Sequence, residues 1–267
     1  NMFRIEVPPS VLQDHTTSRV PMSPHDEEYK MLSMYFISSL VRHRKSIHSS
    51  IWCTKPAVTI DSIESVLCPL LTEQYFIAVK RLRQKHPTGC PEIRSLDLNG
   101  LVQPFHRVVP HKTNLPEDLS SNLNDVFLFH GAEADTIENI CEGGSNLRQG
   151  FDTQLGGQKT GKMFGVGSYF AHNASKTFLY SGSDPSVKHM LVARVLLGKP
   201  YYASRSCSKI VRPPDDCDSV VALSRDEGGA VDHREYIVYK DEAAIPQYII
   251  QYRHQNGCQC HICLHRQ

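Results

Sequence analysis

The stretch "MFGVGSYFAHNASKTFLY", residues 163–180, combines glycines, aromatic rings and a lysine–hydroxyl pair in a pattern that predicts a short strand followed by a short helix. Tyr169 comes after the glycine turn, and Tyr180 lies at the end of the expected helix. Two tyrosine rings placed in this way could hold a flat aromatic ligand between them. The stretch therefore suggests a binding site whose chemistry must come from other parts of the chain.

Two further polar residues stand beside apolar runs in the same half of the chain. His130 closes the strand-like run "VFLFHG", and Glu235 starts the run "EYIVY" just after the polar segment "VDHR". Taken alone, each has an ordinary explanation, because a strand-end His is commonly structural and a Glu before an apolar strand is usually solvated. Tyr169 next to Phe170 would likewise usually belong to a core. A functional interpretation therefore depends on the surrounding sequence.

A third pattern, "GGQKTGK" at residues 156–162, matches part of a phosphate-binding loop. Such a loop needs Ser or Thr after the lysine to hold magnesium, a strand before it and a helix after it. Met163 stands at that position, and the sequence continues into glycine turns and a strand. A P-loop nucleotide hydrolase is therefore a poor alternative.

The first half of the chain contains the longer helical patterns. Residues 1–25 hold four prolines and predict an irregular arm. Apolar spacing predicts helices over 26–45 and 70–84, both with basic C-terminal ends that suit the helix dipole, and a β-rich segment at 57–67. The proline-rich segment 86–125 exceeds the roughly 15 residues usual for a loop, so we expect an insertion, a lid or a partner site.

The second half of the chain is dominated by strands. Its apolar runs predict strands, and only "TIENIC" and "ASKTFLY" predict short helices. This combination of many strands and few short helices favours an α+β domain built on antiparallel sheet. We expect one domain over residues 26–253, followed by a Cys/His-rich tail at 254–267.

Composition limits the class of protein and its partners. The 267 residues are 40% hydrophobic, enough for an ordinary core, and the formal net charge is +1, so no general field attracts nucleic acid or an anionic membrane. The nine cysteines are scattered, and no secretory or membrane-spanning segment stands out. We expect an intracellular protein, located in the nucleus or the cytoplasm. The composition leaves its oligomeric state undecided. Because the chain starts at Asn1 rather than Met, we expect a fragment of a longer protein.

Ordered motifs in the strand-rich half resemble the catalytic domain of the poly(ADP-ribose) polymerases, which are diphtheria-toxin-like ADP-ribosyltransferases. The motifs are "LFHG", "FGVGSYFAHNASKTFLY", "LVARVLLGK" and "REYIVYKDEAAIPQYIIQY". The resemblance spans roughly residues 57–253 apart from the insertion. The pattern of motifs is most similar to that of tankyrase-like members, which lack a regulatory helical domain. It implies an ADP-ribosyltransferase fold with antiparallel or mixed split β-sheets and short flanking helices.

The resemblance also implies how NAD, the substrate, would be gripped at its nicotinamide end. Tyr180 would stack on the nicotinamide ring, and Tyr169 would pack against its other side. The Gly131 backbone and the Thr177 hydroxyl would hydrogen-bond the carboxamide. The family more often has Ser than Thr at position 177, and Ala132 removes a hydroxyl that many members carry.

The same resemblance assigns the reacting end of the site. His130 would anchor the adenosine ribose, and Glu235 would hold the nicotinamide ribose 2′-hydroxyl, stabilise the oxocarbenium-like centre and polarise an acceptor hydroxyl. Lys176 would place a positive charge beside Glu235 and keep its carboxylate ionised. The implied catalytic set is His130, Tyr169, Lys176 and Glu235.

The activity implied by these residues is transfer of ADP-ribose from NAD to an acceptor, which we expect to be a protein. Glu235 together with Lys176 permits chain elongation, so a poly(ADP-ribose) product is the first expectation. Single-unit transfer is the alternative, and a pseudoenzyme that only binds NAD or ADP-ribose is a second one. The acceptor residue stays open at this point.

The tail "CQCHICLH" holds candidate zinc ligands at close spacing: Cys258, Cys260, Cys263 and His265. An exposed Cys-rich tail or the remnant of a cut-off module are the alternatives, because the usual second ligand pair is missing. The structural zinc of tankyrase-like members does not carry over, since the corresponding interval 181–188 has no cysteine. Because "IPQYIIQYR" predicts the closing core strand, we expect the chain to fold and work without the tail.

Overall fold

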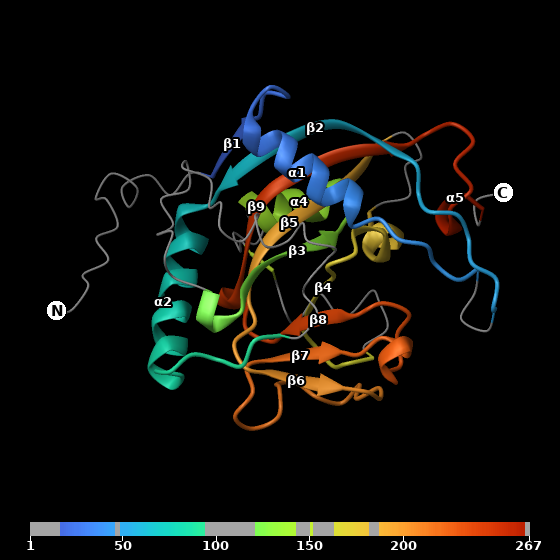
Figure 1. The fold of residues 1–267 in the computed structure, drawn as a ribbon. Coiled ribbons are helices and arrows are strands. Elements are labelled where there is room, and N and C mark those ends of the chain that lie inside the picture. Colours follow the sequence, from blue (N-terminus) through green and yellow to red (C-terminus); the bar gives the residue numbers. More distant parts are fainter. Residues whose placement is uncertain are drawn as a thin grey trace.

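Two β-sheets with helices on both faces of the larger one make up the fold (Figure 1). The computed structural model describes residues 17–45, 49–93, 121–142, 150–151, 163–181 and 187–264. Most of the proline-rich insertion, the "GGQKTGK" motif and His265 lie outside the described residues. The expected α+β class with split sheets is confirmed.

The larger sheet is antiparallel, with the strand order β1-β2-β9-β5-β3. Its strands are β1 (Ser18–Pro21), β2 (Val58–Leu67), β3 (Asp125–Gly131), β5 (Lys188–Leu196) and β9 (Ala244–His254). β3 and β5 are buried on both faces because successive side chains of these strands enter opposite core clusters. Leu128 and Ala193 belong to one cluster, whereas Phe129 and Val192 belong to the other.

Helices cover both of those faces. α1 (Glu27–Ser38) crosses one face of the larger sheet (Figure 1) and buries Leu32, Tyr35 and Phe36 in the cluster that contains Phe129. α2 (Pro69–Lys85) and α4 (Ala134–Glu142) supply side chains to the opposite cluster. The predicted helix at 70–84 and the predicted strand at 57–67 are thus confirmed to within one residue at each end.

The smaller sheet has the order β4-β8-β7-β6 and lies beside one end of the larger sheet (Figure 1). It consists of β4 (Ser168–Phe170), β8 (Glu235–Val238), β7 (Ser219–Ala222) and β6 (Pro200–Ala203), of which only β6 and β7 run parallel. An isolated bridge between Phe129 and Ala171 joins the two sheets through backbone hydrogen bonds of 2.8 and 3.0 Å. The 3-10 helix η2 (Ala174–Tyr180) follows directly after this junction.

Short 3-10 and α-helical turns complete the described chain: η1 (Ser121–Leu123), η3 (Arg225–Glu227), η4 (Asp241–Ala243) and α5 (His261–Leu264). Among the described residues, no helix has both the length and the apolar character needed to cross a bilayer.

Two expectations about the N-terminal half are wrong. The segment 1–25 is not irregular throughout, because Ser18–Pro21 pairs with β2 as an edge strand. The helix predicted over 26–45 ends at Ser38, so the basic run "RHRK" lies beyond it and gains nothing from the helix dipole. That run is extended because the backbone N–H of Val41 and the buried ring of His43 both hydrogen-bond the Ser175 hydroxyl, each at 3.0 Å.

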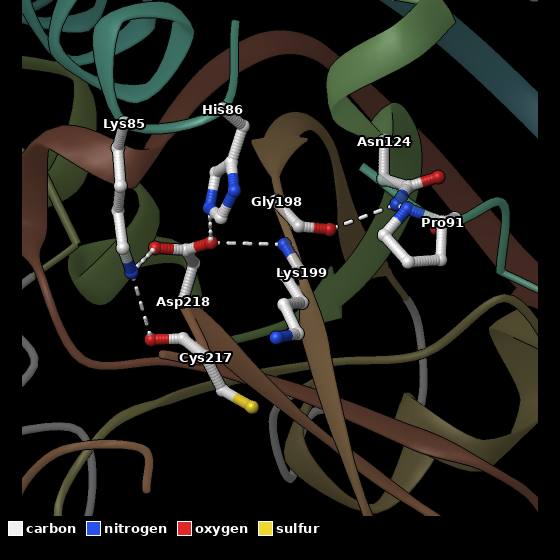
Figure 2. Close-up of polar contacts among 8 residues, drawn as sticks. All are labelled: Lys85, His86, Pro91, Asn124, Gly198, Lys199, Cys217 and Asp218. Atoms are coloured by element: carbon white, nitrogen blue, oxygen red, sulfur yellow. Dashed lines mark hydrogen bonds and ion pairs between the residues drawn. The ribbon is translucent and has the colours of Figure 1, made fainter. Parts of the chain in front are cut away.

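The end of α2 is fastened to the strands of the smaller sheet by one carboxylate (Figure 2). Asp218 accepts hydrogen bonds from Lys85 Nζ at 2.7 Å, from the His86 ring at 2.7 Å and from the Lys199 backbone at 2.9 Å. Asn124 spans the neighbouring turn by donating 2.8 Å hydrogen bonds to the Pro91 and Gly198 carbonyls. These contacts set the position of the smaller sheet against the larger one.

The tail is packed against the domain. The backbone N–H of Gln255 donates to the Ala57 carbonyl at 2.9 Å, so the pairing of β2 with β9 continues past residue 253. Cys260 and Ile262 are buried in the same apolar cluster as Phe36 and Phe178. We therefore expect truncation after Arg253 to cost stability, contrary to the expectation from sequence.

Candidate active site

The junction of the two sheets brings together residues from three strands and η2. His130 is the penultimate residue of β3, Tyr169 is the middle residue of β4, and Glu235 starts β8, with β4 and β8 directly paired. Lys176, Thr177 and Tyr180 come from η2, which packs against β3. The residues that sequence analysis selected thus converge on one region.

His130 is oriented by the strand opposite to it. Its Nδ1 lies 2.9 Å from the Tyr169 carbonyl, and because a carbonyl can only accept, Nδ1 must carry a proton. Burial lowers the pKa of His130, although this hydrogen bond opposes the effect. The imidazole is therefore neutral near pH 7, with Nε2 as a hydrogen-bond acceptor.

Gly131 is required by the close approach of β3 and η2. A Cβ at this position would lie 2.2 Å from the Thr177 carbonyl oxygen and 2.8 Å from the Ser181 hydroxyl. Any side chain would therefore push η2 away from the strand. The neighbouring residues His130 and Gly131 therefore have separate roles. His130 supplies an oriented imidazole, and Gly131 lets the backbone of η2 approach β3.

The Tyr169 ring is held in place through its own hydroxyl. Oη donates to the Gly165 carbonyl at 2.8 Å and accepts from the Phe164 backbone at 3.1 Å. Gly165 has a φ of +84°, and a Cβ there would lie 1.9 Å from the Ile210 carbonyl, which explains the glycine in this turn. Burial raises the pKa of Tyr169 to about 12, so the hydroxyl stays protonated. The half-buried ring therefore presents a fixed aromatic surface.

An ion pair joins η2 to the smaller sheet. Lys176 Nζ lies 2.9 Å from Glu235 Oε1, and the two side chains are 23% and 15% exposed. Burial alone would lower the pKa of Lys176, but the charge of Glu235 outweighs it and the pKa is raised. The ammonium group is consequently charged at neutral pH.

The end of η2 carries the exposed ring of Tyr180 and the buried hydroxyl of Thr177. Tyr180 is 42% exposed, so its ring can accept a stacking partner. The Thr177 hydroxyl is buried and donates to the Ala174 carbonyl at 2.9 Å, with Met190 Sδ 3.0 Å away. To donate to a carboxamide oxygen, this hydroxyl would have to turn away from Ala174, whereas it could accept a hydrogen bond from the carboxamide without turning.

Comparison with known proteins identifies the domain. The chain matches the family model described as the poly(ADP-ribose) polymerase catalytic domain over residues 59–228. The chain belongs to this family. The match contains every candidate residue on β3, β4 and η2, and it ends before Glu235.

Curated relatives of this domain are named protein mono-ADP-ribosyltransferases. PARP12 of Mus musculus is 33% identical over 126 residues, which is 47% of this chain and 16% of the relative. PARP14 of Homo sapiens is 31% identical over 135 residues, covering 49% and 7% of the two chains. PARP11 of Mus musculus is 29% identical over 154 residues, covering 49% and 43%. The chain therefore spans less than half of the length of these relatives.

Three of the four candidate zinc ligands also come together, at the end of β9. Cys258, Cys260 and Cys263 gather around His254, whereas His265 lies outside the described residues. His254 was not among the ligands expected from the sequence, because it stands before the Cys-rich run "CQCHICLH". The spacing H-x3-C-x-C-x2-C was visible, but only the turn at Gly257 brings the strand end back to the cysteines.

Proposed function

We propose that this domain cleaves NAD at the nicotinamide–ribose bond and transfers ADP-ribose to a protein acceptor. The observation that carries the proposal is the Lys176–Glu235 pair, held at the sheet junction beside His130 and two tyrosines in a member of this family. Cleavage of the bond creates an oxocarbenium-like centre, so the domain must hold the leaving ring, hold the ribose and supply a negative charge.

The leaving ring would lie between two tyrosines of different exposure. Tyr169 is fixed by its two hydroxyl contacts and would form the rigid side of the clamp. Tyr180 is the exposed partner that would close onto the nicotinamide. The Gly131 backbone and the Thr177 oxygen are within the same junction and would recognise the carboxamide, with Thr177 as an acceptor.

The two riboses would be held by the neutral imidazole and by the carboxylate. Because Nδ1 of His130 is occupied by the Tyr169 carbonyl, Nε2 would accept a hydrogen bond from a hydroxyl of the adenosine ribose. Glu235 would use Oε2 for the 2′-hydroxyl of the nicotinamide ribose, since Lys176 contacts Oε1. The same carboxylate would stabilise the cation and take the proton of the acceptor hydroxyl.

The number of units transferred is a separate question. Lys176 and Glu235 together permit elongation, which favoured a poly(ADP-ribose) product on sequence grounds. The names of PARP12, PARP14 and PARP11 as mono-ADP-ribosyltransferases support single-unit transfer to protein instead. We propose single-unit transfer as the main activity, with elongation as the competing outcome.

The decisive experiment measures nicotinamide release from NAD in the presence of a protein acceptor, with ATP turnover in parallel. Nicotinamide release with label on protein is the expected result. Binding of NAD without release would identify a pseudoenzyme, and ATP turnover would identify a hydrolase. On a denaturing gel, a discrete labelled band indicates single units, whereas a ladder or smear indicates chains.

A further inference from the structure

The end of β9 and the segment that follows it bring one histidine and three cysteines close together as potential metal ligands. His254 is the last residue of β9, Cys258 follows the turn, Cys260 directly precedes α5, and Cys263 lies within α5. The ligand atoms of His254, Cys258, Cys260 and Cys263 all lie within 4.8 Å of one another. Neither the family match nor the mechanism proposed above uses any of them.

Three of the six separations among these atoms match a tetrahedral zinc site, and all six are within 4.8 Å. With a Zn–S bond of about 2.3 Å and a Zn–N bond of about 2.0–2.1 Å, tetrahedral angles require S···S of about 3.8 Å and S···N of about 3.6 Å. Cys260 and Cys263 have their sulfurs 3.8 Å apart, and His254 Nδ1 lies 3.6 Å from both Cys258 and Cys260. A disulfide would instead bring two sulfurs to about 2.0 Å.

The surrounding backbone supports this arrangement. The Ala57 N–H donates to Cys258 Sγ at 3.4 Å, a contact that stabilises a thiolate and links the site to the start of β2. Gly257 has a φ of +78°, which lets the chain reverse between His254 and Cys258. Cys260 has no exposed surface, so its sulfur is directed into the protein.

A second group of metal-capable residues in the described chain gives the contrast. His86, Cys90 and Asp218 also lie within reach of one ion. Asp218, however, already accepts from His86, from the Lys199 backbone and from the ammonium group of Lys85 at 2.7 Å (Figure 2). A cation there would have to displace a charged lysine, so this group is a structural polar network.

We propose that His254 Nδ1 and the thiolates of Cys258, Cys260 and Cys263 bind a structural zinc ion. Three thiolates and one imidazole select zinc among common divalent ions, and four protein ligands leave no open position for catalysis. Binding would release the three thiol protons to solvent. The site differs from the interval 181–188, where tankyrase-like members place their zinc.

The zinc centre would also brace η2, the helix that carries Lys176, Thr177 and Tyr180 of the proposed active site. The His254 ring packs edge-on against Phe178 of η2, with centroids 5.3 Å apart. His261 stands between Cys260 and Cys263, and its ring centroid lies 4.1 Å from that of His43. The His43 ring in turn hydrogen-bonds the Ser175 hydroxyl of η2 at 3.0 Å. The first contact ends at Phe178 and the second at Ser175, on either side of Lys176 and Thr177 in η2, so the centre would hold η2 against the larger sheet.

Metal content of the purified chain tests the site directly. Chain prepared with zinc in the medium should contain about one tightly bound zinc ion, the stoichiometry of a single four-ligand site. Cys263→Ser and Cys260→Ser should lose it, while Cys90→Ser, in the contrasting network, should keep it. No bound zinc in the parent chain, or full zinc in both tail variants, would overturn the proposal.

Cobalt substitution covers the case in which the tail variants do not fold. Co²⁺ exchanged into the parent chain should give the visible absorption of a tetrahedral thiolate complex, and Cys90→Ser should leave that spectrum unchanged. An octahedral spectrum without sulfur charge-transfer bands would overturn the ligand set. Neither readout depends on NAD turnover, so the zinc site and the proposed activity can fail separately.

Hydrogen exchange tests the bracing role. Removing zinc from the parent chain with a chelator should increase amide exchange in η2 and at the end of β9, while α2 stays protected. Unchanged exchange in η2 after the metal has left would show that the centre organises only the tail and would overturn the bracing role.

Discussion

Two ion pairs in this domain each join a carboxylate to a basic side chain, but their surroundings differ. One is Asp125–Arg194 in the larger sheet, and the other is Lys176–Glu235 at the junction of the two sheets. Asp125 and Arg194 lie in the larger sheet with side chains 1% and 4% exposed, and Tyr75 adds a 2.7 Å hydrogen bond to the carboxylate. Arg194 Nε contacts both Asp125 oxygens at 2.9 and 2.8 Å, so the carboxylate has no capacity left for a ligand. The carboxylate of this pair is buried and fully engaged by Tyr75 and Arg194.

The Lys176–Glu235 pair is open by comparison. Its side chains are 23% and 15% exposed, and one contact of 2.9 Å joins them. A buried pair contributes to the structure because breaking it strands a charge. A partly exposed pair, in which the described residues bond only Oε1 of Glu235, can change partners when a substrate arrives. The difference indicates that bonding capacity, rather than charge, separates a structural pair from a pair that can bind a ligand.

The largest effect is expected from breaking the Asp125–Arg194 pair. Asp125→Asn should lower the free energy of unfolding by about 3–5 kcal/mol, because it leaves Arg194 charged and buried without a carboxylate. Denaturant unfolding of the purified domain measures this loss. Replacing both partners with apolar residues, as in Asp125→Leu with Arg194→Met, should recover part of it. A loss under about 1 kcal/mol would remove the structural half of the comparison.

The open pair should show the reverse pattern. Glu235→Gln should reduce ADP-ribosyl transfer about 100- to 1,000-fold, the equivalent of about 3–4 kcal/mol in the barrier, because the amide cannot stabilise the cation or accept a proton. Its melting temperature should stay close to that of the parent chain. Unchanged nicotinamide release would contradict the assignment, whereas single-unit transfer that persists without chains would limit Glu235 to elongation.

The ring beside the open pair gives a smaller effect with an internal control. Tyr180→Ala should weaken binding of nicotinamide-like inhibitors by about 1–3 kcal/mol, as aromatic stacking on flat bases does. Tyr180→Phe retains the ring and should bind nearly as well as the parent chain. Calorimetric titration measures both constants, and equal losses in the two variants would indicate a hydrogen bond in place of stacking.

A third ion pair, Glu227 with Arg234, should give the smallest effect. The hydrogen bond from Arg234 lowers the pKa of Glu227 from 4.5 to about 2, although burial opposes the shift. A lowered folded-state pKa stabilises the fold above the unfolded-state pKa, and the contribution disappears as the pH falls toward the folded value. Because this carboxylate is partly exposed, Glu227→Gln should cost no more than about 1 kcal/mol at pH 7.

Unfolding measured along a pH series checks this last expectation. The difference between the parent chain and Glu227→Gln should be constant above about pH 5 and vanish between about pH 4.5 and pH 2. A difference that grows as the pH falls would have the wrong sign for a carboxylate with a lowered pKa.

Periodicity in the sequence predicted the elements that pack against one another along their whole length. β2, α2, β5 and β9 appear where apolar spacing placed them, because each contributes a continuous apolar face to the core. β1 and β6 were missed because four residues on an edge strand carry no readable alternation. α1 was extended too far because its amphipathic pattern continues into residues that instead contact Ser175.

The sequence alone determined the family motifs and, through them, the candidate site residues His130, Tyr169, Lys176 and Glu235, because these stand in recognisable flanking runs. Tertiary structure decided how they are used. The bridge between Phe129 and Ala171, the commitment of the Thr177 proton to Ala174 and the addition of His254 to the cysteine group depend on where the backbone and side chains pack. Local sequence determines which face of an element is buried, whereas only the packed chain determines which polar atoms meet there and which still have a hydrogen bond to give.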